Sequence, residues 1–245
     1  MKTKFTFLSV AFLLLTSVIN VYAQETESLY MPSGRPGYTT SASLVGKKSL
    51  LLETGVAYDN LGSITTINTS TLRFGFTNHI EGRFSATESI YDGGFHCSNL
   101  SLAAKIGLIE KNNTKFSVLP KFSFPVDDND PSGALALLYS VKLNENWSMS
   151  ANAATRTTKG DDTFISTVAL AAGRSLNDKL SLSAELYCDG MANHVYNTYY
   201  IGVALAYQIL PRLQLDLSTT RYSNRNLKQL ADNWNIEAGL CWLIK

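Results

Sequence analysis

The sequence predicts an all-β fold, a transmembrane antiparallel up-and-down β-barrel of about 12 strands. Three observations support this prediction: an export signal at the N-terminus, apolar residues at every second position over most of the chain, and links that alternate between short and long. Strands that cross an outer membrane have about nine to eleven residues and alternate apolar with polar residues in this way.

The composition excludes several other classes of protein. Of the 245 residues, 45% are hydrophobic and 17% are charged, and 21 Lys and Arg nearly balance 20 Asp and Glu. A nucleic-acid-binding protein would carry a basic excess, and a disordered chain would be less hydrophobic. The three cysteines form no CxxC pair and no cluster with histidine, so we expect no metal site and no cofactor.

The N-terminus has the three parts of a secretory signal peptide. Lys2 and Lys4 supply positive charge, an apolar run follows over 5–15, and a small-residue exit ends at Ala23. This run is too short to cross a bilayer, which argues against the alternative of an uncleaved anchor. We expect residues 1–23 to be removed by cleavage near Ala23, and the mature protein to reach the outer membrane of a Gram-negative-type cell envelope.

Residues 24–47 are polar and show no clear period, so we expect an extended segment in the periplasm or in the lumen of the barrel. The barrel itself is predicted over residues 48–245, where apolar residues recur with period two. Its expected strands lie at 48–58, 64–77, 80–91, 99–109, 114–126, 133–143, 147–157, 163–175, 180–189, 196–209, 213–222 and 233–244.

Each expected strand has one apolar face, which a barrel would turn toward lipid. In chain order, examples of these apolar faces are Leu50, Leu52, Val56 and Tyr58; Leu72, Phe74 and Phe76; Ile80 and Phe84; Leu100, Leu102 and Ile106; Leu180, Leu182 and Leu186; Tyr199, Ile201 and Val203; Leu213, Leu215 and Leu217; and Trp234, Ile236 and Leu240. The aromatic residues near run ends, Tyr222 among them, are typical of interfacial girdles.

The links between the strands alternate in length. Short turns are expected at 78–79, 110–113, 144–146, 177–178 and 211–212, and longer links at 59–63, 92–98, 127–132, 158–162, 190–195 and 223–232. With a periplasmic N-terminus, the longer links are extracellular, as in outer-membrane barrels. A soluble β-sandwich also alternates, but long strands, the export signal and the link asymmetry favour a barrel, whose closure leaves no unpaired edge in lipid.

The last strand carries a signal for assembly. The run Glu237-Ala238-Gly239-Leu240-Cys241-Trp242-Leu243-Ile244 resembles the pattern by which the barrel-assembly machinery recognises its clients. We therefore expect this machinery and outer-membrane lipid as partners.

Two motifs resemble the start of a known family. The run Arg35-Pro36-Gly37-Tyr38-Thr39-Thr40-Ser41, followed by Glu53-Thr54-Gly55-Val56-Ala57-Tyr58, is similar to the opening of the outer-membrane transporter family named after the meta-pathway of phenol degradation. The resemblance implies a barrel that passes small aromatic or hydrophobic solutes. This chain has Gly34, Gly37 and Thr40 where the family usually carries acids around the Arg-Pro pair.

Charged residues fall on the face opposite the apolar one, and this face must be inside because Arg or Lys at mid-bilayer costs about 2–4 kcal/mol. The candidate lumen-lining residues are Glu53, Arg73, Glu81, Arg83, Lys105, Lys121, Glu185, Asp216 and Glu237, with Lys142 and Arg156 on the same face. They could form a field that selects solutes, or a salt-bridged interior that only holds the barrel together. Arg174 falls on the apolar face, near a turn, where it can snorkel to the interface.

Catalysis is the rival function class. His96 and His194 lie in expected outer links, where Ser98 and Asp189 could join a Ser/His/acid arrangement, but no spacing supports one, so we expect no catalytic residues and no enzyme.

Cys97 and Cys188 lie near the outer ends of expected strands, and in an oxidising compartment they could form a disulfide; unbridged packing is the alternative. The sequence as a whole predicts an outer-membrane channel or passive transporter. The alternative is a non-conducting structural or adhesive barrel that acts through its extracellular loops.

Overall fold

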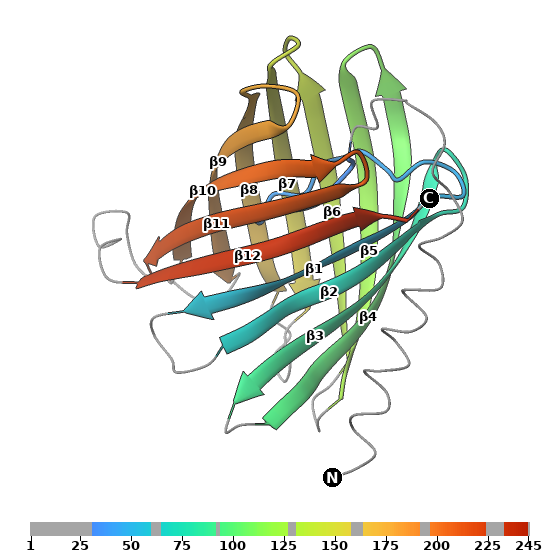
Figure 1. The fold of residues 1–245 in the computed structure, drawn as a ribbon. Helices are drawn as coiled ribbons and strands as arrows, with labels where there is room; N and C mark the ends of the chain where they lie inside the picture. The colour runs from blue at the N-terminus through green and yellow to red at the C-terminus, as the bar shows by residue number, and fades with distance from the viewer. Residues whose placement is uncertain are drawn as a thin grey trace. The chain divides into compact units, whose positions relative to one another are not determined.

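The computed structural model describes residues 31–59, 65–91, 94–126, 131–157, 164–191, 197–223 and 233–244. Within these residues the chain forms twelve strands that join in one closed barrel (Figure 1). The strands are β1 (Leu50–Asp59), β2 (Thr65–Gly75), β3 (Ile80–Tyr91), β4 (Gly94–Lys111), β5 (Thr114–Pro125), β6 (Ser132–Lys142), β7 (Trp147–Thr157), β8 (Phe164–Ser175), β9 (Leu180–Met191), β10 (Asn197–Leu210), β11 (Leu213–Ser223) and β12 (Asn233–Leu243). The predicted fold class is thereby confirmed. The expected signal peptide lies outside the described residues.

Every strand pairs antiparallel with its neighbours in the chain, and β1 pairs with β12 to close the barrel. The closing register runs from Leu51 opposite Leu243 to Asp59 opposite Asn235. Closure gives both sides of every strand a hydrogen-bonding partner, so that the sheet has no open edge.

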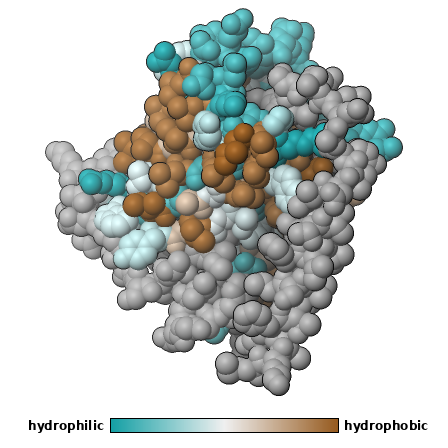
Figure 2. Space-filling view, viewed as in Figure 1, coloured by the Kyte–Doolittle hydropathy of each residue, from teal (hydrophilic) through white to brown (hydrophobic). Residues whose placement is uncertain are grey.

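The two faces of the barrel wall differ as the alternation predicts. Outward positions carry large apolar side chains that are exposed, such as Val168 at 58% and Leu102 at 55%. Inward positions carry buried polar and charged groups, among them Arg73 and Lys105 at 0%. Figure 2 shows apolar side chains gathered over the strands of the face in view, with hydrophilic residues at the end that holds the short turns.

The predicted strand bounds agree with the structure to within two residues, except at the start of β4. A link was expected over 92–98, but β4 begins at Gly94 and continues its pairing with β3, with Ser89 opposite His96 and Glu88 opposite Cys97. In the run from Gly94 to Ser98, Phe95 and Cys97 alternate in the opposite phase to Leu100 and Leu102, because the pairing with β3 shifts register between Thr87 and Glu88. A search for one continuous phase therefore misses the start of this strand.

Short turns with local side-chain hydrogen bonds define one end of the barrel, called here the short-turn end. Asn144 Oδ1 accepts the backbone N–H groups of Asn146 and Trp147, and Asn177 Oδ1 accepts those of Lys179 and Leu180. Such Asx contacts fix tight turns. The six longer links that were expected at the opposite end, called the loop end, fall partly or wholly outside the described residues.

Among the described residues, no helix is both long and apolar enough to cross a membrane.

Candidate functional site in the barrel interior

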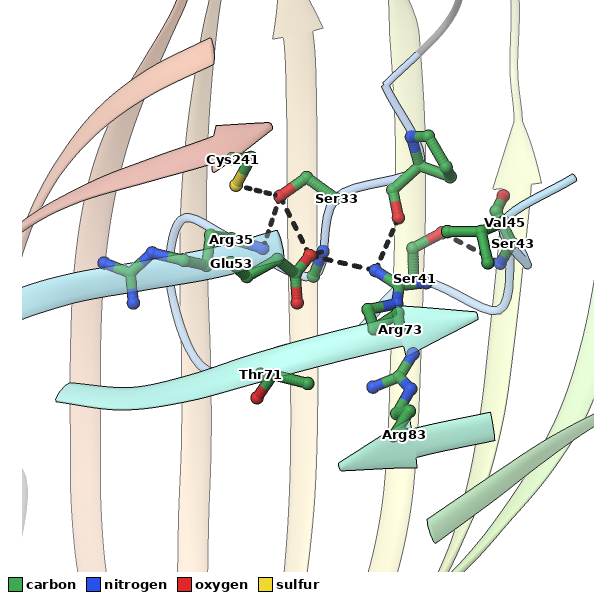
Figure 3. A network of polar contacts seen from close by, with 12 residues as sticks. Ser33, Arg35, Ser41, Ser43, Val45, Glu53, Thr71, Arg73, Arg83 and Cys241 are labelled. Atoms are coloured by element: carbon green, nitrogen blue, oxygen red, sulfur yellow. Dashed lines mark hydrogen bonds and ion pairs between the residues drawn. The ribbon is translucent and has the colours of Figure 1, made fainter. Parts of the chain in front are cut away.

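Residues 31–48, called here the inner belt, follow the inner wall of the barrel. The belt starts beside β1 and β12, where Glu53 Oε1 accepts the N–H of Gly34 at 2.6 Å and Ser33 Oγ lies 2.9 Å from Cys241 Sγ. Figure 3 shows this start of the belt among inward-pointing side chains of the wall.

The belt then passes β9, β7, β6 and β3 before it enters β1. Along this path Glu185 accepts the N–H groups of Tyr38 and Thr39 at 2.9 Å each. Further backbone N–H groups of the belt donate to Asn152 of β7 at 2.7 Å, to Ser140 of β6 at 2.9 Å and to Glu81 of β3 at 2.8 Å. The belt thus runs around the inside of the barrel.

These contacts satisfy the backbone hydrogen-bonding groups of the belt. The belt has no regular secondary structure, and a buried backbone N–H or C=O without a partner is costly. Side chains of the wall replace the missing backbone partners: carboxylates accept the amides, while Lys105 Nζ donates to the carbonyls of Ser41 and Ser43 at 2.7 and 2.9 Å. Val45 and Ala42 of the belt are fully buried, so apolar packing adds to the polar contacts.

Arg73 is the centre of a buried ion network. Its Nη1 donates to Glu53 Oε1 at 2.9 Å and to the carbonyl of Pro32 at 2.7 Å, and its Nε donates to Glu81 Oε1 at 2.7 Å. Arg83 Nε donates to the same Glu81 oxygen at 2.7 Å. A buried charge needs such pairing, because its desolvation otherwise costs several kcal/mol.

Arg35 lies against a pair of glycines in the wall. Gly55 of β1 and Gly239 of β12 are register partners, and a Cβ on either would overlap the Arg35 guanidinium. The missing side chains let this guanidinium reach Asp216 at 3.1 Å and Glu237 at 3.7 Å. Gly55 of the motif Glu53-Thr54-Gly55 therefore makes room for Arg35 of the first motif.

Four tyrosines, three of them stacked and the fourth tilted, form a series called here the tyrosine row. The ring centroids of Tyr38 and Tyr187 are 4.3 Å apart at an interplanar angle of 11°, and those of Tyr187 and Tyr200 are 4.2 Å apart at 9°. Tyr222 continues the series at 5.6 Å from Tyr200 and donates its hydroxyl to Asp59 at 2.9 Å. Tyr187, Tyr200 and Tyr222 are direct register partners on β9, β10 and β11.

The row corrects one expectation about Tyr222. The sequence suggested a membrane girdle for it, but it shares the inward face of β11 with Asp216 and Ser218, which are buried. Arg174, expected to snorkel, lies on the outward face with its Cζ 5.3 Å from the ring centroid of Trp147.

A cavity of about 140 Å³ lies between the belt and the wall formed by β7, β8 and β9. Its lining is mostly small or polar and includes Arg35, Thr39, Ser150, Gly173, Ser183 and Glu185. The belt therefore leaves open space on this side of the interior.

The structure brings most of the predicted lumen-lining residues together. Eight of them contact the belt or each other: Glu53, Arg73, Glu81, Arg83, Lys105, Glu185, Asp216 and Glu237. Lys121 lies on the inward face of β5 with Ser117 and Ser123, and within the described residues no ion pair joins it to that cluster. Sequence reasoning missed Arg35 and the tyrosine row, because both depend on which residues of different strands are register partners.

Of the two alternatives for Cys97 and Cys188, a disulfide or unbridged packing, the structure has both thiols free. Strands β5 to β8 lie between the strands that carry them. Cys188 also shares the outward face of β9 with Leu186, opposite the exposed Val168. Its thiol therefore points away from the interior, where a bridge across the barrel would have to pass.

Two of the residues considered for catalysis bond elsewhere; one of them is Ser98, whose hydroxyl donates to the carbonyl of Thr87. Asp189 accepts the Thr167 hydroxyl and lies 4.0 Å from Arg156, while His194 lies outside the described residues. Within the described part of the chain, no group of three or more His, Cys, Asp or Glu side chains is placed to hold a metal ion.

Known proteins share the sequence pattern or the fold of this barrel. The family model described as "Putative MetA-pathway of phenol degradation" matches residues 33–243. The solved structure of the KdgM porin has a TM-score of 0.59 at 10% sequence identity, and that of the NanC porin has 0.61 at 7%. Each comparison covers 78% of this chain and 98% of the porin, and at these identities it shows a shared fold. None of the curated proteins matches the sequence.

Replacing Arg73 by leucine would leave the carboxylates of Glu53 and Glu81 buried without their shared cation. We expect the free energy of unfolding to fall by about 3–5 kcal/mol, measured by urea titration of the refolded barrel. The control is Lys115→Gln, which breaks an exposed pair with Glu110 and should cost at most about 1 kcal/mol. Equal losses in the two variants would contradict the role given to Arg73.

In Gly239→Ala the new methyl group would occupy the place of the Arg35 guanidinium. We expect the start of the belt to detach, so that the amides of residues 33–35 exchange hydrogen for deuterium faster, as followed by mass spectrometry. Gly133→Ala is the matched control, since a Cβ at Gly133 meets nothing within 4 Å. Unchanged exchange in Gly239→Ala would show that the belt does not depend on this contact.

Proposed function

Because the chain belongs to the family described as "Putative MetA-pathway of phenol degradation", we propose that it is an outer-membrane channel for the passive passage of small solutes that carry an aromatic or other flat apolar ring. The observation that carries the proposal is the tyrosine row, which places four aromatic rings along the inside of a closed barrel.

The outward face supports a place in a membrane. Large apolar side chains are exposed on strand after strand, including Phe84, Leu137, Leu170 and Leu205. Soluble proteins rarely expose apolar patches larger than a few hundred Å². A barrel with a polar interior and an apolar exterior matches lipid outside and water inside. The proposal includes cleavage near Ala23, outside the described residues, and assembly through the Glu237 to Ile244 signal.

The tyrosine row crosses β9, β10 and β11 and, because barrel strands are tilted, also rises along the barrel. Tyr187 lies seven residues and Tyr222 nine residues after the starts of β9 and β11, and both of these starts are at the short-turn end. Tyr38 belongs to the belt, nearer the short-turn end. The row therefore leads from the loop end down to the belt.

Weak contacts between a solute ring and the tyrosines suit passage through a channel better than tight binding would. An aromatic pair, edge-to-face or stacked, contributes about 0.5–1.5 kcal/mol beyond its buried area. Several weak and similar sites in succession let a solute enter and also leave, as transport through a pore requires.

One observation favours a second candidate, a non-conducting structural or adhesive barrel. The belt is bonded to the wall through Glu53, Glu81 and Glu185, and so it narrows the interior. Single-channel recording of refolded residues 24–245 in a planar bilayer separates the two candidates. Discrete openings support the channel, and a folded barrel that never conducts would overturn it in favour of the second candidate.

The tyrosine row can be tested with benzamide, an uncharged aromatic solute that should block the openings. In Tyr200→Leu the central ring is lost, and we expect the apparent Kd for block to rise about two- to tenfold. The matched control is Tyr199→Leu, which removes the neighbouring ring from the outward face of β10. An equal effect of the two substitutions would rule out the row as the path of the ring.

Deletion of residues 24–47 tests the belt as the narrow part of the channel. Removing the belt leaves the interior wider, so single-channel conductance should rise well above that of the full mature chain. Circular dichroism and heat-dependent electrophoretic mobility would confirm that the shortened barrel is folded. A folded barrel with unchanged conductance would contradict the narrowing role.

A further inference from the structure

We propose that Arg83, Lys121 and Arg156 form a track along the inner wall that binds carboxylate groups of the solutes admitted by the channel, an assignment that rests on the proposed function. These three residues are called here the basic row. The solutes would then be aromatic acids, with a ring for the tyrosine row and a carboxylate for the basic row.

Strand register places the three cations in one line. Arg83 of β3 is opposite Ala103 of β4, which is opposite Lys121 of β5. Lys121 is opposite Ala134 of β6, which is opposite Arg156 of β7. Neighbouring strands lie about 4.8 Å apart, so successive cations of the row are about 10 Å apart along the wall. The alanines between them leave room beside each cation.

All three cations belong to the inward face. Arg83 is two residues from buried Glu81, and Lys121 is two residues from buried Ser123. Arg156 has the parity of buried Asn152 on β7. The residues of opposite parity, such as Phe84 and Phe122, are exposed on the outside.

The basic row has donor capacity that the protein does not use. Arg83 Nη2 is buried without a hydrogen-bond partner, and the side chain as a whole is 10% exposed. Within the part of the chain that the structure describes, no ion pair joins Lys121 to a carboxylate. Arg156 is 57% exposed and reaches Asp189 only at 4.0 Å.

Other inward cations differ on this point. The donors of Arg73 are taken by Glu53, Glu81 and the belt, and Lys105 donates to two carbonyls of the belt. These two residues hold the structure together, whereas a ligand carboxylate would complete the bonding of the basic row. Charge-assisted hydrogen bonds of this kind are the strong ones in proteins.

The basic row also runs along the path of a solute. The strands β3, β5 and β7 all start at the short-turn end. From these starts it is three residues to Arg83, seven to Lys121 and nine to Arg156. The row thus climbs from the belt toward the loop end, as the tilt of barrel strands requires. Arg156 lies 4.0 Å from Asp189, which is two residues after Tyr187 on β9, so the basic row and the tyrosine row approach each other there.

The test compares benzoate with benzamide, which share a ring and differ in charge. In the wild type we expect chloride to be favoured over potassium in a salt gradient, and benzoate to block more tightly than benzamide. Lys121→Gln should weaken block by benzoate about tenfold and leave block by benzamide unchanged. Lys179→Gln, in the turn before β9, is the matched control and should behave as the wild type does.

The outcomes distinguish this inference from the proposed function. A conducting channel whose benzoate block is equal in wild type and Lys121→Gln would overturn the basic row and leave the channel intact. If the folded wild type does not conduct, calorimetry of benzoate binding to the barrel in detergent decides: binding that Lys121→Gln weakens supports the basic row, and no binding by the wild type overturns it. Arg156→Gln, whose side chain is the most exposed of the three, repeats the test where Lys121→Gln fails to fold.

Discussion

The structure depends on the need to pair every backbone polar group of an irregular segment enclosed by a sheet. The strands satisfy one another through the closed ladder, but the inner belt has no ladder of its own. Its amides and carbonyls must find side chains, and water is largely displaced where the belt is buried. This requirement explains why carboxylates such as Glu53, Glu81 and Glu185 point inward, and why Lys105 is tolerated at 0% exposure.

The same requirement separates two roles that the sequence left open for the charged lumen. A salt-bridged interior and a solute-selecting field were alternatives there. The contacts divide them between residues: Arg73 and Lys105 direct their donors to the protein itself, while Arg83 and Lys121 keep donors in reserve. Both roles can therefore occur in one interior, one near the belt and the other along the wall above it.

Sequence periodicity was enough to predict the strands and the face of each residue, because a side chain in a strand alternates with period two. The inward position of Glu81, Lys105 and Asp216 follows from that rule alone. The same rule argues for unbridged packing of Cys188, since Cys188 has the parity of the apolar residues of β9. The tyrosine row and the glycine pair at Arg35 could not be predicted, because they require the register between strands, and register is set by turns and bulges that periodicity does not encode.

The anchoring of Arg35 has a consequence for the order of events during assembly. Its partners are Asp216 of β11, Glu237 of β12 and the glycines of β1 and β12. The glycine pair exists only after the first and last strands have met. Arg35 can therefore reach its full set of partners only in a barrel that is already closed, although it precedes every strand in the chain. In a partly assembled barrel Arg35 would lack the glycine pair, so its docking would follow the pairing of β1 with β12.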